Sequence, residues 1–583
     1  MLIIKTFILL FLHISNAEDE TLIEEEAEVK EEAEEKEYRL EEEALEQYLE
    51  ENKNPHIVFI LADDLGWNDV SFHGSPQIPT PNIDALAANS IILNSYYTEN
   101  NCAQSRASLM SGLYPIHLGL QHSQISSGKV AALPLDVKIL PEYLKDKNYL
   151  TYMVGKWNLG YFKKEFTPNN RGFDSFYGFY NEQIDYFDFT NYQKYGETMN
   201  KLFYGVDLQD NATPVKNMRG RYATEVFTEK AVNFIENHNE SFPLFLYMAH
   251  LAPHTGNDYM PLQAPLRLIY KNAQIQDPKR RIYAGMISAL DESIGKTVEA
   301  LSKRGFLNNT IIIFASDNGG LNKESNWPFR GLKRGPWEGG IRVPCFIWSP
   351  LLGLKEPRTT YNLMHVTDWL PTVYSAAGGD VKELGKIDGY NMWKDLIANT
   401  PTSRIEILHN IDPISKTSVL RRGDYKLIDG TESGGNDLWY GTDINKELYQ
   451  PSSMDEWIFK NGSLAKEIFQ NSNIWLVKTP DSWRNNTSVT CKQPPPSGNG
   501  GCDPNEAPCL FNVAADPCEY NNLASQYPRI VKSMMKIISN YNETAVEPLL
   551  NSTDPRGDPK CHGFSYVPWL DEEYNLDCSY LGI

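Results

Sequence analysis

The sequence predicts an α/β fold, in which a large, mixed and mostly parallel sheet is flanked by helices and followed by a smaller C-terminal α+β domain. Three observations support this prediction. Short runs of β-branched and aromatic residues end in polar turns, segments with helical apolar spacing separate them, and the pattern changes beyond about residue 400. Alternation of strands and helices is typical of a parallel sheet that is covered on both faces.

Three apolar runs of β-forming residues define the predicted sheet: His56–Ala62, Leu244–Met248 and Thr310–Ala315. Their nearly unbroken apolar character indicates strands buried on both faces. Ile282–Leu301 has apolar residues three and four apart, as expected of a covering helix. Ligands of such sheets bind at the carboxyl ends of the strands, so the polar residues after each run are candidates for a site.

Beyond residue 400 the predicted elements are shorter and their loops are rich in Gly, Asn and Pro. We expect strands and a final helix at Arg404–Leu408, Tyr425–Asp429, Glu447–Tyr449 and Tyr527–Tyr541. We therefore divide the body of the protein into a larger domain, residues 54–400, and a smaller disulfide-containing domain, residues 401–583.

The first 53 residues differ from this body. Residues 1–17 have the pattern of a signal peptide, with Lys5 before an apolar core and Ser15-Asn16-Ala17 as the cleavage site. A membrane anchor is the alternative, but this run and every later one are too short to span a bilayer. Residues 18–51 contain 18 acidic and 3 basic residues, so we expect 18–53 to form a solvated acidic tail. An interaction tail for basic partners or cations is the other interpretation, and nothing indicates nucleic-acid binding.

Glycosylation sequons and cysteines also indicate export through the endoplasmic reticulum. Six of the eight cysteines lie in the last 93 residues, which predicts disulfides formed in an oxidising compartment. A zinc site has little support, because no Cys-x-x-Cys pair has a matching second pair. Six cysteines allow 15 pairings, and Cys102 and Cys345 stay unassigned. The eight sequons are at Asn211, Asn239, Asn308, Asn461, Asn485, Asn486, Asn542 and Asn551.

Two pairs of oxygen-bearing side chains follow two of the predicted strands, Asp63-Asp64 and Asp317-Asn318. Such side chains suit a hard divalent cation, and Ca²⁺ fits better than softer metals. Taken singly, each pair is more often part of a turn or a helix cap.

Cys102 precedes a predicted helix, residues 103–112, which Gly112 ends. At the helix N-terminus, free amides and the helix dipole favour a negative group such as sulfate. Two other interpretations are a buried free thiol and a thiolate nucleophile, which needs a poised histidine.

The run from Asn101 to Gly112, with Cys-x-x-Ser-Arg near its start, resembles the nucleophile loop of the sulfatases. The resemblance extends from about residue 54 to 578, and Pro508–Phe511 with Asp516–Glu519 is similar to the arylsulfatase B branch, the N-acetylgalactosamine-4-sulfatases and their relatives. Further shared segments are Gly155–Gly160, Arg171–Asp174, Asn326–Lys333, Trp337–Gly340 and Thr367–Thr372.

This resemblance implies an alkaline-phosphatase-like sulfatase fold and a sulfuric ester hydrolase of arylsulfatase type. It implies that the formylglycine-generating enzyme oxidises Cys102 to formylglycine, whose hydrate attacks the sulfur of a sulfate monoester. The second hydroxyl then restores the aldehyde and expels sulfate, which a serine could not do. The implied Ca²⁺ ligands are Asp63, Asp64, Asp317, Asn318 and the converted residue 102.

The same resemblance assigns four further roles. Arg106 would secure the hydrated aldehyde, Lys156 and Lys333 would bind sulfate oxygens, and His254 would protonate or orient the leaving oxygen. Solvated lysines and a structural histidine are the ordinary interpretations of such residues. His250 is the nearby alternative to His254.

Two positions depart from the family pattern, and both concern the aldehyde. Gln104 replaces the proline of Cys-x-Pro-x-Arg, whose rigidity aids recognition by the modifying enzyme. Asn158 replaces a histidine that is a candidate base for release of sulfate, and asparagine takes up no proton near neutral pH. A second hypothesis is therefore a sulfatase-like protein that binds Ca²⁺ and sulfated ligands with weak or no turnover. A third is a relative that acts on phosphate esters.

The favoured hypothesis is a secreted or lysosomal sulfatase without a membrane span. It would hydrolyse a sulfate ester of a sugar, as a small molecule or glycan, or of an aryl-type molecule. The sequence indicates no particular substrate or oligomeric state.

Overall fold

The computed structural model describes residues 54–122, 124–195, 201–321, 323–431, 439, 452–491, 496, 498–550 and 552–574. These residues belong to one compact unit, Asn54–Ile583. Five predicted features lie outside the described residues: the signal peptide, the acidic tail, the strand at Glu447–Tyr449, the sequon at Asn551 and the cysteine Cys578.

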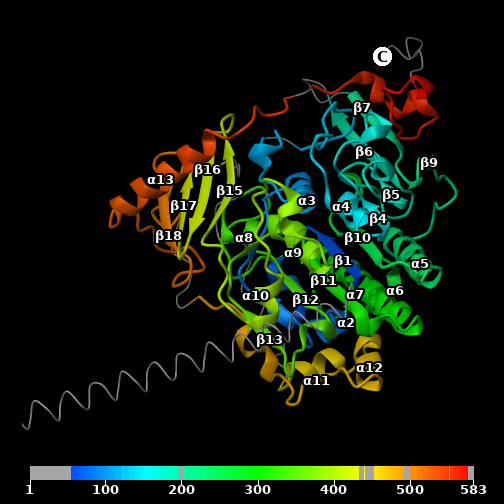
Figure 1. Ribbon diagram of the computed structural model, residues 1–583, viewed down its shortest axis with the longest axis horizontal. Helices are drawn as coiled ribbons and strands as arrows, with labels where there is room; N and C mark the ends of the chain where they lie inside the picture. The colour runs from blue at the N-terminus through cyan, green and yellow to red at the C-terminus, as the bar shows by residue number, and fades with distance from the viewer. Residues whose placement is uncertain are drawn as a thin grey trace, which may run out of the picture. The chain divides into compact units, whose positions relative to one another are not determined.

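A ten-stranded sheet forms the centre of this unit (Figure 1). Five adjacent strands, β11, β1, β10, β4 and β5, run parallel to one another. On either side of them the pairing is antiparallel: β12 with β11, β8 with β5, and β9 with β8. The prediction of a mixed, mostly parallel sheet is therefore confirmed. In spatial order the strands are β13 (Arg358–Thr360), β2 (Ile91–Leu93), β12 (Cys345–Trp348), β11 (Thr310–Ser316), β1 (His56–Asp63), β10 (Leu244–Pro253), β4 (Leu150–Lys156), β5 (Ser175–Phe179), β8 (Gln209–Asp210) and β9 (Thr213–Pro214).

One strand is longer than its sequence indicates. The predicted end of β10 at Met248 was wrong, because the strand continues through His250 to Pro253. A polar histidine in an apolar run looks like a strand end, but His250 is buried and its Nε2 lies 3.2 Å from Ser293 Oγ. The extension follows a register shift in which Asp63 of β1 pairs with Pro253.

Helices cover both faces of this sheet (Figure 1). Alternate residues of β1, such as Val58 and Ile60, pack in one apolar cluster with α2, α5 and α7. On the other face, Phe59 contacts Trp369 of α9, with ring centroids 5.6 Å apart. The helices of this part are α2 (Pro81–Ala87), α3 (Cys102–Ser111), α4 (Leu140–Asp146), α5 (Ala223–Glu236), α6 (Leu266–Lys271), α7 (Pro278–Lys303), α8 (Glu338–Ile341), α9 (Trp369–Ala376) and α10 (Trp393–Ala398).

A smaller antiparallel sheet follows, with α13 (Pro528–Asn542) packed against it (Figure 1). The intervening α11 (Met454–Phe459) and α12 (Leu464–Asn471) instead lie near the large sheet, where Phe469 stacks on Trp348 at 5.0 Å. The domain boundary at residue 400 therefore stays a prediction. The four strands, in order, are β15 (Glu406–Asp412), β16 (Thr417–Arg422), β17 (Tyr425–Asp429) and β18 (Cys509–Asn512).

A buried ion cluster joins α8 to the smaller sheet. Lys426 Nζ of β17 donates to Glu338 Oε1 (3.1 Å) and to Glu519 Oε1 (2.8 Å), and the backbone N–H of Glu338 donates to Glu519 Oε2 (2.9 Å). Arg342 Nη1 also lies 3.4 Å from Glu338 Oε2, so Glu338 has two cationic partners, whereas Lys426 is the cation beside Glu519 and the charge of Glu338 disfavours a second carboxylate charge there. Burial, despite Lys426, raises the pKa of Glu519 to about 7.

Disulfides tie the C-terminal region, as predicted. Cys491 is bonded to Cys518 and Cys502 to Cys509, and Cys561 is disulfide-bonded as well. The free cysteines among the described residues are Cys102 and Cys345, both buried. All seven sequon asparagines in the described part of the chain are exposed. None of the helices described combines the length and the apolar character needed to traverse a bilayer.

Candidate active site

The carboxyl ends of four parallel strands converge at one edge of the large sheet. Asp63 ends β1, Lys156 ends β4, and His254 and Asp317 directly follow β10 and β11. Cys102 is the first residue of α3, which ends at Gly112 in a left-handed conformation (φ 68°). The structure buries and brings together all nine residues that the sequence singled out: Asp63, Asp64, Cys102, Arg106, Lys156, His254, Asp317, Asn318 and Lys333.

The Cys102 thiol lies among carboxylates and a lysine. It donates toward Asp63 Oδ1 at 3.3 Å and lies 3.7 Å from Asp64 Oδ1. Lys333 Nζ donates to Cys102 Sγ at 2.9 Å. Residue 102 therefore faces a lysine and two carboxylates from the first turn of a helix, where the helix dipole also favours negative charge.

Two buried cations hold Asp63 and Asp317. Lys156 Nζ lies 2.7 Å from Asp63 Oδ2. The Arg106 guanidinium donates to Asp317 Oδ2 through Nη2 (2.8 Å) and Nε (3.1 Å), and its Nη1 donates to the Lys156 carbonyl (3.2 Å). Burial and then the Asp63 charge raise the pKa of Asp317 to about 6, although Arg106 opposes both. Buried charges that lack such partners would be strongly destabilising.

Asp64 adopts a left-handed backbone conformation (φ 62°), which is uncommon for a residue other than glycine. Its backbone N–H donates to Asp317 Oδ1 (3.1 Å), and its carboxylate accepts from Asn318 Nδ2 (2.6 Å) and Lys333 Nζ (2.8 Å). Burial would raise the pKa of Asp64, but Lys333 and then His254 outweigh it and hold this pKa below its usual value.

The oxygen atoms at this edge fit a hard divalent cation. Single atoms of Asp63, Asp64, Cys102 and His254 all lie within 4.8 Å of one another. Asn318 Oδ1 is buried and has no hydrogen-bond partner, although Asn318 Nδ2 has two. An orphaned acceptor beside several carboxylates is costly unless a cation or donor reaches it, and oxygen donors of this kind suit Ca²⁺.

His254, and not His250, faces these residues. His254 Nδ1 donates to the Thr255 carbonyl (2.6 Å), so Nε2 carries the lone pair of the neutral ring and lies 3.6 Å from Asp64 Oδ2. Burial lowers the pKa of His254 to about 4, although the Asp64 charge opposes this. The Tyr186 hydroxyl fixes the loop by donating to the His254 carbonyl (2.8 Å).

A protein-family model described as Sulfatase matches residues 55–379 of this sequence. The chain belongs to the sulfatase family. Membership supports sulfate ester hydrolysis as the type of reaction, and formylglycine and Ca²⁺ are general features of the family.

Individual sulfatases resemble most of the chain. Arylsulfatase J of Mus musculus is 37% identical over 522 residues, 89% of this chain and 81% of that protein. N-acetylgalactosamine-6-sulfatase of Homo sapiens is 29% identical over 358 residues, 59% of this chain and 66% of that protein. The crystal structure of Ps i-CgsB is similar at 27% sequence identity and a TM-score of 0.65, and the match covers 91% of this chain and 99% of the Ps i-CgsB chain. The predicted sulfatase fold is thereby confirmed.

The environment of Cys102 disfavours the thiolate hypothesis. Burial and then the Asp317 charge raise the pKa of this thiol well above its usual value, although Lys156 and Lys333 oppose them. The hydrogen-bond partners of Sγ among the described residues are Asp63, Asp64 and Lys333. A thiolate nucleophile needs a histidine in hydrogen-bond contact, and none of these partners is one.

Both departures from the sulfatase pattern are buried. Gln104 Nε2 donates to the Leu120 carbonyl (2.9 Å), whereas Gln104 Oε1 has no partner. Asn158 has a left-handed backbone (φ 55°), which asparagine tolerates, and its Nδ2 donates to the Ile125 carbonyl (3.0 Å).

Sequence reasoning missed two supporting residues. Ser316 Oγ accepts the Leu65 N–H (3.0 Å) and donates to the Asn318 carbonyl (2.8 Å), which fixes both loops that carry the candidate metal ligands. Tyr186 positions His254, as described above. A serine at a strand end and an aromatic residue in a loop carry no sequence signal that distinguishes them from ordinary structural residues.

Proposed function

We propose that this sulfatase-family protein is an active sulfuric ester hydrolase that uses a Cys102-derived formylglycine and Ca²⁺. The observation that carries the proposal is the position of Cys102 at a helix N-terminus, 2.9 Å from Lys333 Nζ and within hydrogen-bond distance of Asp63. Its substrate class is a sulfate monoester of a sugar or an aryl-type alcohol.

In this proposal Asp63, Asp64, Asp317, Asn318 and residue 102 hold Ca²⁺. The bound ion would supply positive charge that favours a deprotonated nucleophile and offsets the charge of the sulfate oxygens. The unpartnered Asn318 Oδ1 supports this ligand set.

The remaining residues would act on the substrate directly. Lys333 already contacts residue 102, and Lys156 lies beside Asp63, so both ammonium groups can reach sulfate oxygens and stabilise the charge that spreads over them. Arg106 would orient residue 102 through Asp317. His254 Nε2 is the atom available to exchange a proton with the leaving oxygen.

Other features support a proposal for the branch of the sulfatase family and for the cellular location of the protein. The C-terminal Pro508–Phe511 segment, which overlaps β18, supports the arylsulfatase B branch through its sequence resemblance. Disulfides and exposed sequons support passage through the endoplasmic reticulum, where the formylglycine-generating enzyme would act, and then secretion or delivery to lysosomes.

The second candidate function is a Ca²⁺-dependent binding protein for sulfated ligands with weak or no turnover. Two observations favour it: Gln104 stands at the proline position of the modification motif, and Asn158 offers an amide where a proton acceptor is expected. The intact set of charged residues favours catalysis.

Sulfate release distinguishes the two candidates. Full-length protein is expressed with the formylglycine-generating enzyme, and 4-nitrophenyl sulfate and sulfated sugars are the substrates. We expect Cys102→Ala to lower turnover to background, and a Ca²⁺ chelator to abolish turnover reversibly.

The matched control is Cys345→Ala, because Cys345 is the other buried free cysteine of the described chain and lies in β12. It should keep turnover per folded molecule. Undiminished hydrolysis by Cys102→Ala would rule out the nucleophile assignment, and insensitivity to chelation would rule out the Ca²⁺ site.

A further inference from the structure

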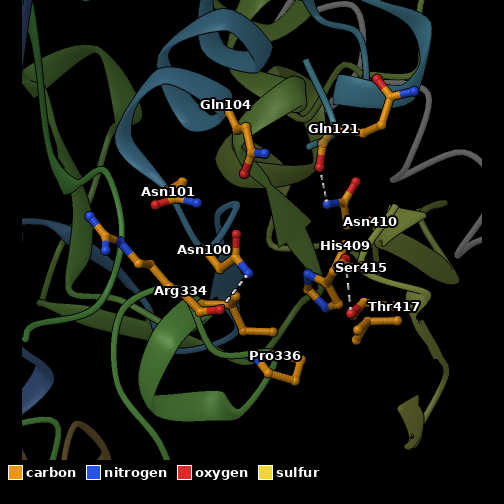
Figure 2. Close-up of a pocket in the computed structure, with 12 residues that line it drawn as sticks. Asn100, Asn101, Gln104, Gln121, Arg334, Pro336, His409, Asn410, Ser415 and Thr417 are labelled. Atoms are coloured by element: carbon orange, nitrogen blue, oxygen red, sulfur yellow. Dashed lines mark hydrogen bonds between the residues drawn. The ribbon is translucent and has the colours of Figure 1, made fainter. Parts of the chain in front are cut away.

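A surface pocket of about 390 Å³ is formed by α11, α12 and the loop that follows α12, and we call it the α11–α12 pocket. Small-molecule pockets span roughly 300–1,000 Å³, so this one can hold a ligand of that kind. The polar pocket beside α3, which Figure 2 shows, has a volume of only about 20 Å³ and has room for about one water molecule. The α11–α12 pocket is lined by Asp455, Glu456, Phe459, Lys460, Lys466, Gln470, Trp475, Val477, Lys478 and Pro480.

The α11–α12 pocket lies apart from the candidate active site (Figure 1). Next to the lining residue Gln470, Phe469 of α12 stacks on Trp348 of β12, with ring centroids 5.0 Å apart. Trp348 pairs with Ile312 near the start of β11, whereas Asp317 follows the end of that strand. Strand residues advance by about 3.3 Å each, so this contact lies towards the opposite edge of the sheet from Asp317. A ligand in the pocket is therefore distant from the candidate catalytic residues.

Hydrogen bonds attach the walls of the pocket to the body of the protein. At the start of α12, Ser463 Oγ donates to the Pro81 carbonyl (2.9 Å). In the loop after α12, the Leu476 N–H donates to Asn89 Oδ1 (2.6 Å). Both walls are therefore held in place without a ligand, and a preformed pocket costs less to fill than one that a ligand must order.

The lining has more positive than negative charge to offer a ligand. Three lysines belong to it: Lys460, Lys466 and Lys478. Within the described part of the chain, no carboxylate forms an ion pair with any of them. Of the two lining carboxylates, Asp455 already pairs with Arg484 (Nη2 to Oδ1, 2.8 Å), and Glu456 is exposed.

Lys466 is the least exposed of the three lysines. Its Nζ lies 4.0 Å from the ring centroid of Phe459 and 5.3 Å from that of Trp475, and burial lowers its pKa. Lys230, elsewhere in the protein, also lies over two aromatic rings, but its Nζ pairs with Asp210 Oδ2 at 2.9 Å. Lys466 lacks such a carboxylate, so a negative group of a ligand would supply the missing partner.

The pocket also offers apolar surface beside these charges. Phe459 and Trp475 pack edge to face with ring centroids 6.1 Å apart, and Val477 and Pro480 lie in the same lining. Apolar walls with a few charged groups are typical of sites for small organic molecules. A ligand that matches this lining therefore has an apolar body and a negative group.

We propose that the α11–α12 pocket is a second ligand site, which binds a small organic anion with an apolar body. The negative group pairs with Lys466, and Lys460 and Lys478 add positive charge around it. The apolar body packs against Phe459 and Trp475. Binding involves no covalent step and does not depend on residue 102, so the site goes beyond the proposed function.

Calorimetry on the full-length protein tests this proposal with ligands that contain no ester bond. Naphthalene-2-sulfonate, 2-naphthoate and 2-naphthylphosphonate place three different negative groups on one apolar body. Naphthalene-2-sulfonamide keeps the body without the charge, and inorganic sulfate keeps the charge without the body. We expect the tightest of the three anions to bind at least about tenfold more tightly than either control ligand, because each control lacks one of the two interactions.

Lys466→Gln should weaken binding of that anion about fivefold to tenfold, because it removes the charge and nearly keeps the length of the side chain. Lys460→Gln is the second variant, at an exposed position on which folding does not depend, and it should weaken binding about twofold to threefold. Lys230→Gln is the matched control, since Lys230 also lies over two rings but is outside the lining, and it should leave binding unchanged.

Binding that neither Lys466→Gln nor Lys460→Gln weakens would overturn the proposal, as would equal binding of the neutral sulfonamide. Binding that is lost in Lys333→Gln and kept in Lys466→Gln would assign the anion to the candidate active site instead. Selective binding that Lys466→Gln weakens, in a protein that releases no sulfate, would uphold this site and leave only the proposed catalysis refuted.

Discussion

Residue 102 lies where three buried carboxylates meet two lysines and an arginine. Asp63, Asp64 and Asp317 are each within hydrogen-bond distance of a cationic side chain. Because a buried charge without a partner destabilises the fold, removal of any one of these groups perturbs its neighbours. Variants of this set therefore need a measurement of folding beside the measurement of turnover.

Asn158 provides the sharpest test among single side chains. We predict that Asn158→His raises sulfate release about tenfold or more per converted molecule, because a histidine can supply the proton transfer that asparagine cannot. The left-handed backbone at this position also accommodates histidine. Turnover is measured per mole of formylglycine, so that altered conversion does not enter the comparison.

Asn158→Leu is the control, since it removes the hydrogen bond to Ile125 without adding a base, and it should give no gain. An Asn158→His variant that turns over no faster would mean that another group supplies the base.

Sequence alone could identify the residues whose side chains are common metal ligands or catalytic groups. Asp63, Asp317 and Cys102 stand at strand or helix ends, and the sulfatase resemblance adds Lys333 and His254, all of which the structure brings together. Residues that act through hydrogen bonds to neighbours could not be found in this way. The partner of Ser316 Oγ lies about 250 residues away in the chain, at Leu65, and only the fold brings them together.

Among the elements, β1 and α3 follow their sequence patterns closely, whereas β10 does not. The apolar run of β1 and the glycine that ends α3 are local signals, and both predict the observed elements to within one residue at each end. In β10 a single histidine breaks the apolar pattern, but Ser293 of α7 lies within hydrogen-bond distance of its Nε2 and the strand continues. A tertiary contact overrides the local pattern in such a case.

The joint between α8 and the smaller sheet should make stability depend on pH. The pKa of Glu519 is raised from 4.5 to about 7 in the folded protein, so its stabilising contribution is present below pH 4.5 and is lost as the pH rises through about 7. We predict that Glu519→Gln gains stability relative to the unsubstituted protein between pH 5 and 8, by up to about 3 kcal/mol. The partner Glu338, whose pKa is lowered to about 2, does not titrate in this range.

Chemical unfolding at several pH values measures this difference, and other titrating groups cancel because both proteins contain them. Glu506→Gln, at an exposed position, is the control. A stability difference between Glu519→Gln and the unsubstituted protein that is constant across the range would show that Glu519 is ionised throughout.

In the whole molecule, Cys102 lies at the carboxyl edge of the ten-stranded sheet, and the start of its helix α3 is near the four-stranded sheet. Gln104 of α3 lines one small pocket together with Asn410 of β15 and Thr417 of β16. Neither sheet's sequence indicates this surface, because Gln104 and Asn410 are about 300 residues apart in the chain. The central strands of the large sheet and the disulfide-rich C-terminal region, in contrast, follow from patterns within each segment.

The mass of the peptide that contains residue 102 decides whether this protein can be a sulfatase by the mechanism proposed. It is measured on protein secreted by cells that contain an active formylglycine-generating enzyme. We predict formylglycine at position 102, in a fraction that rises in proportion to sulfate release across preparations. An unmodified cysteine in every molecule would contradict the proposed catalysis.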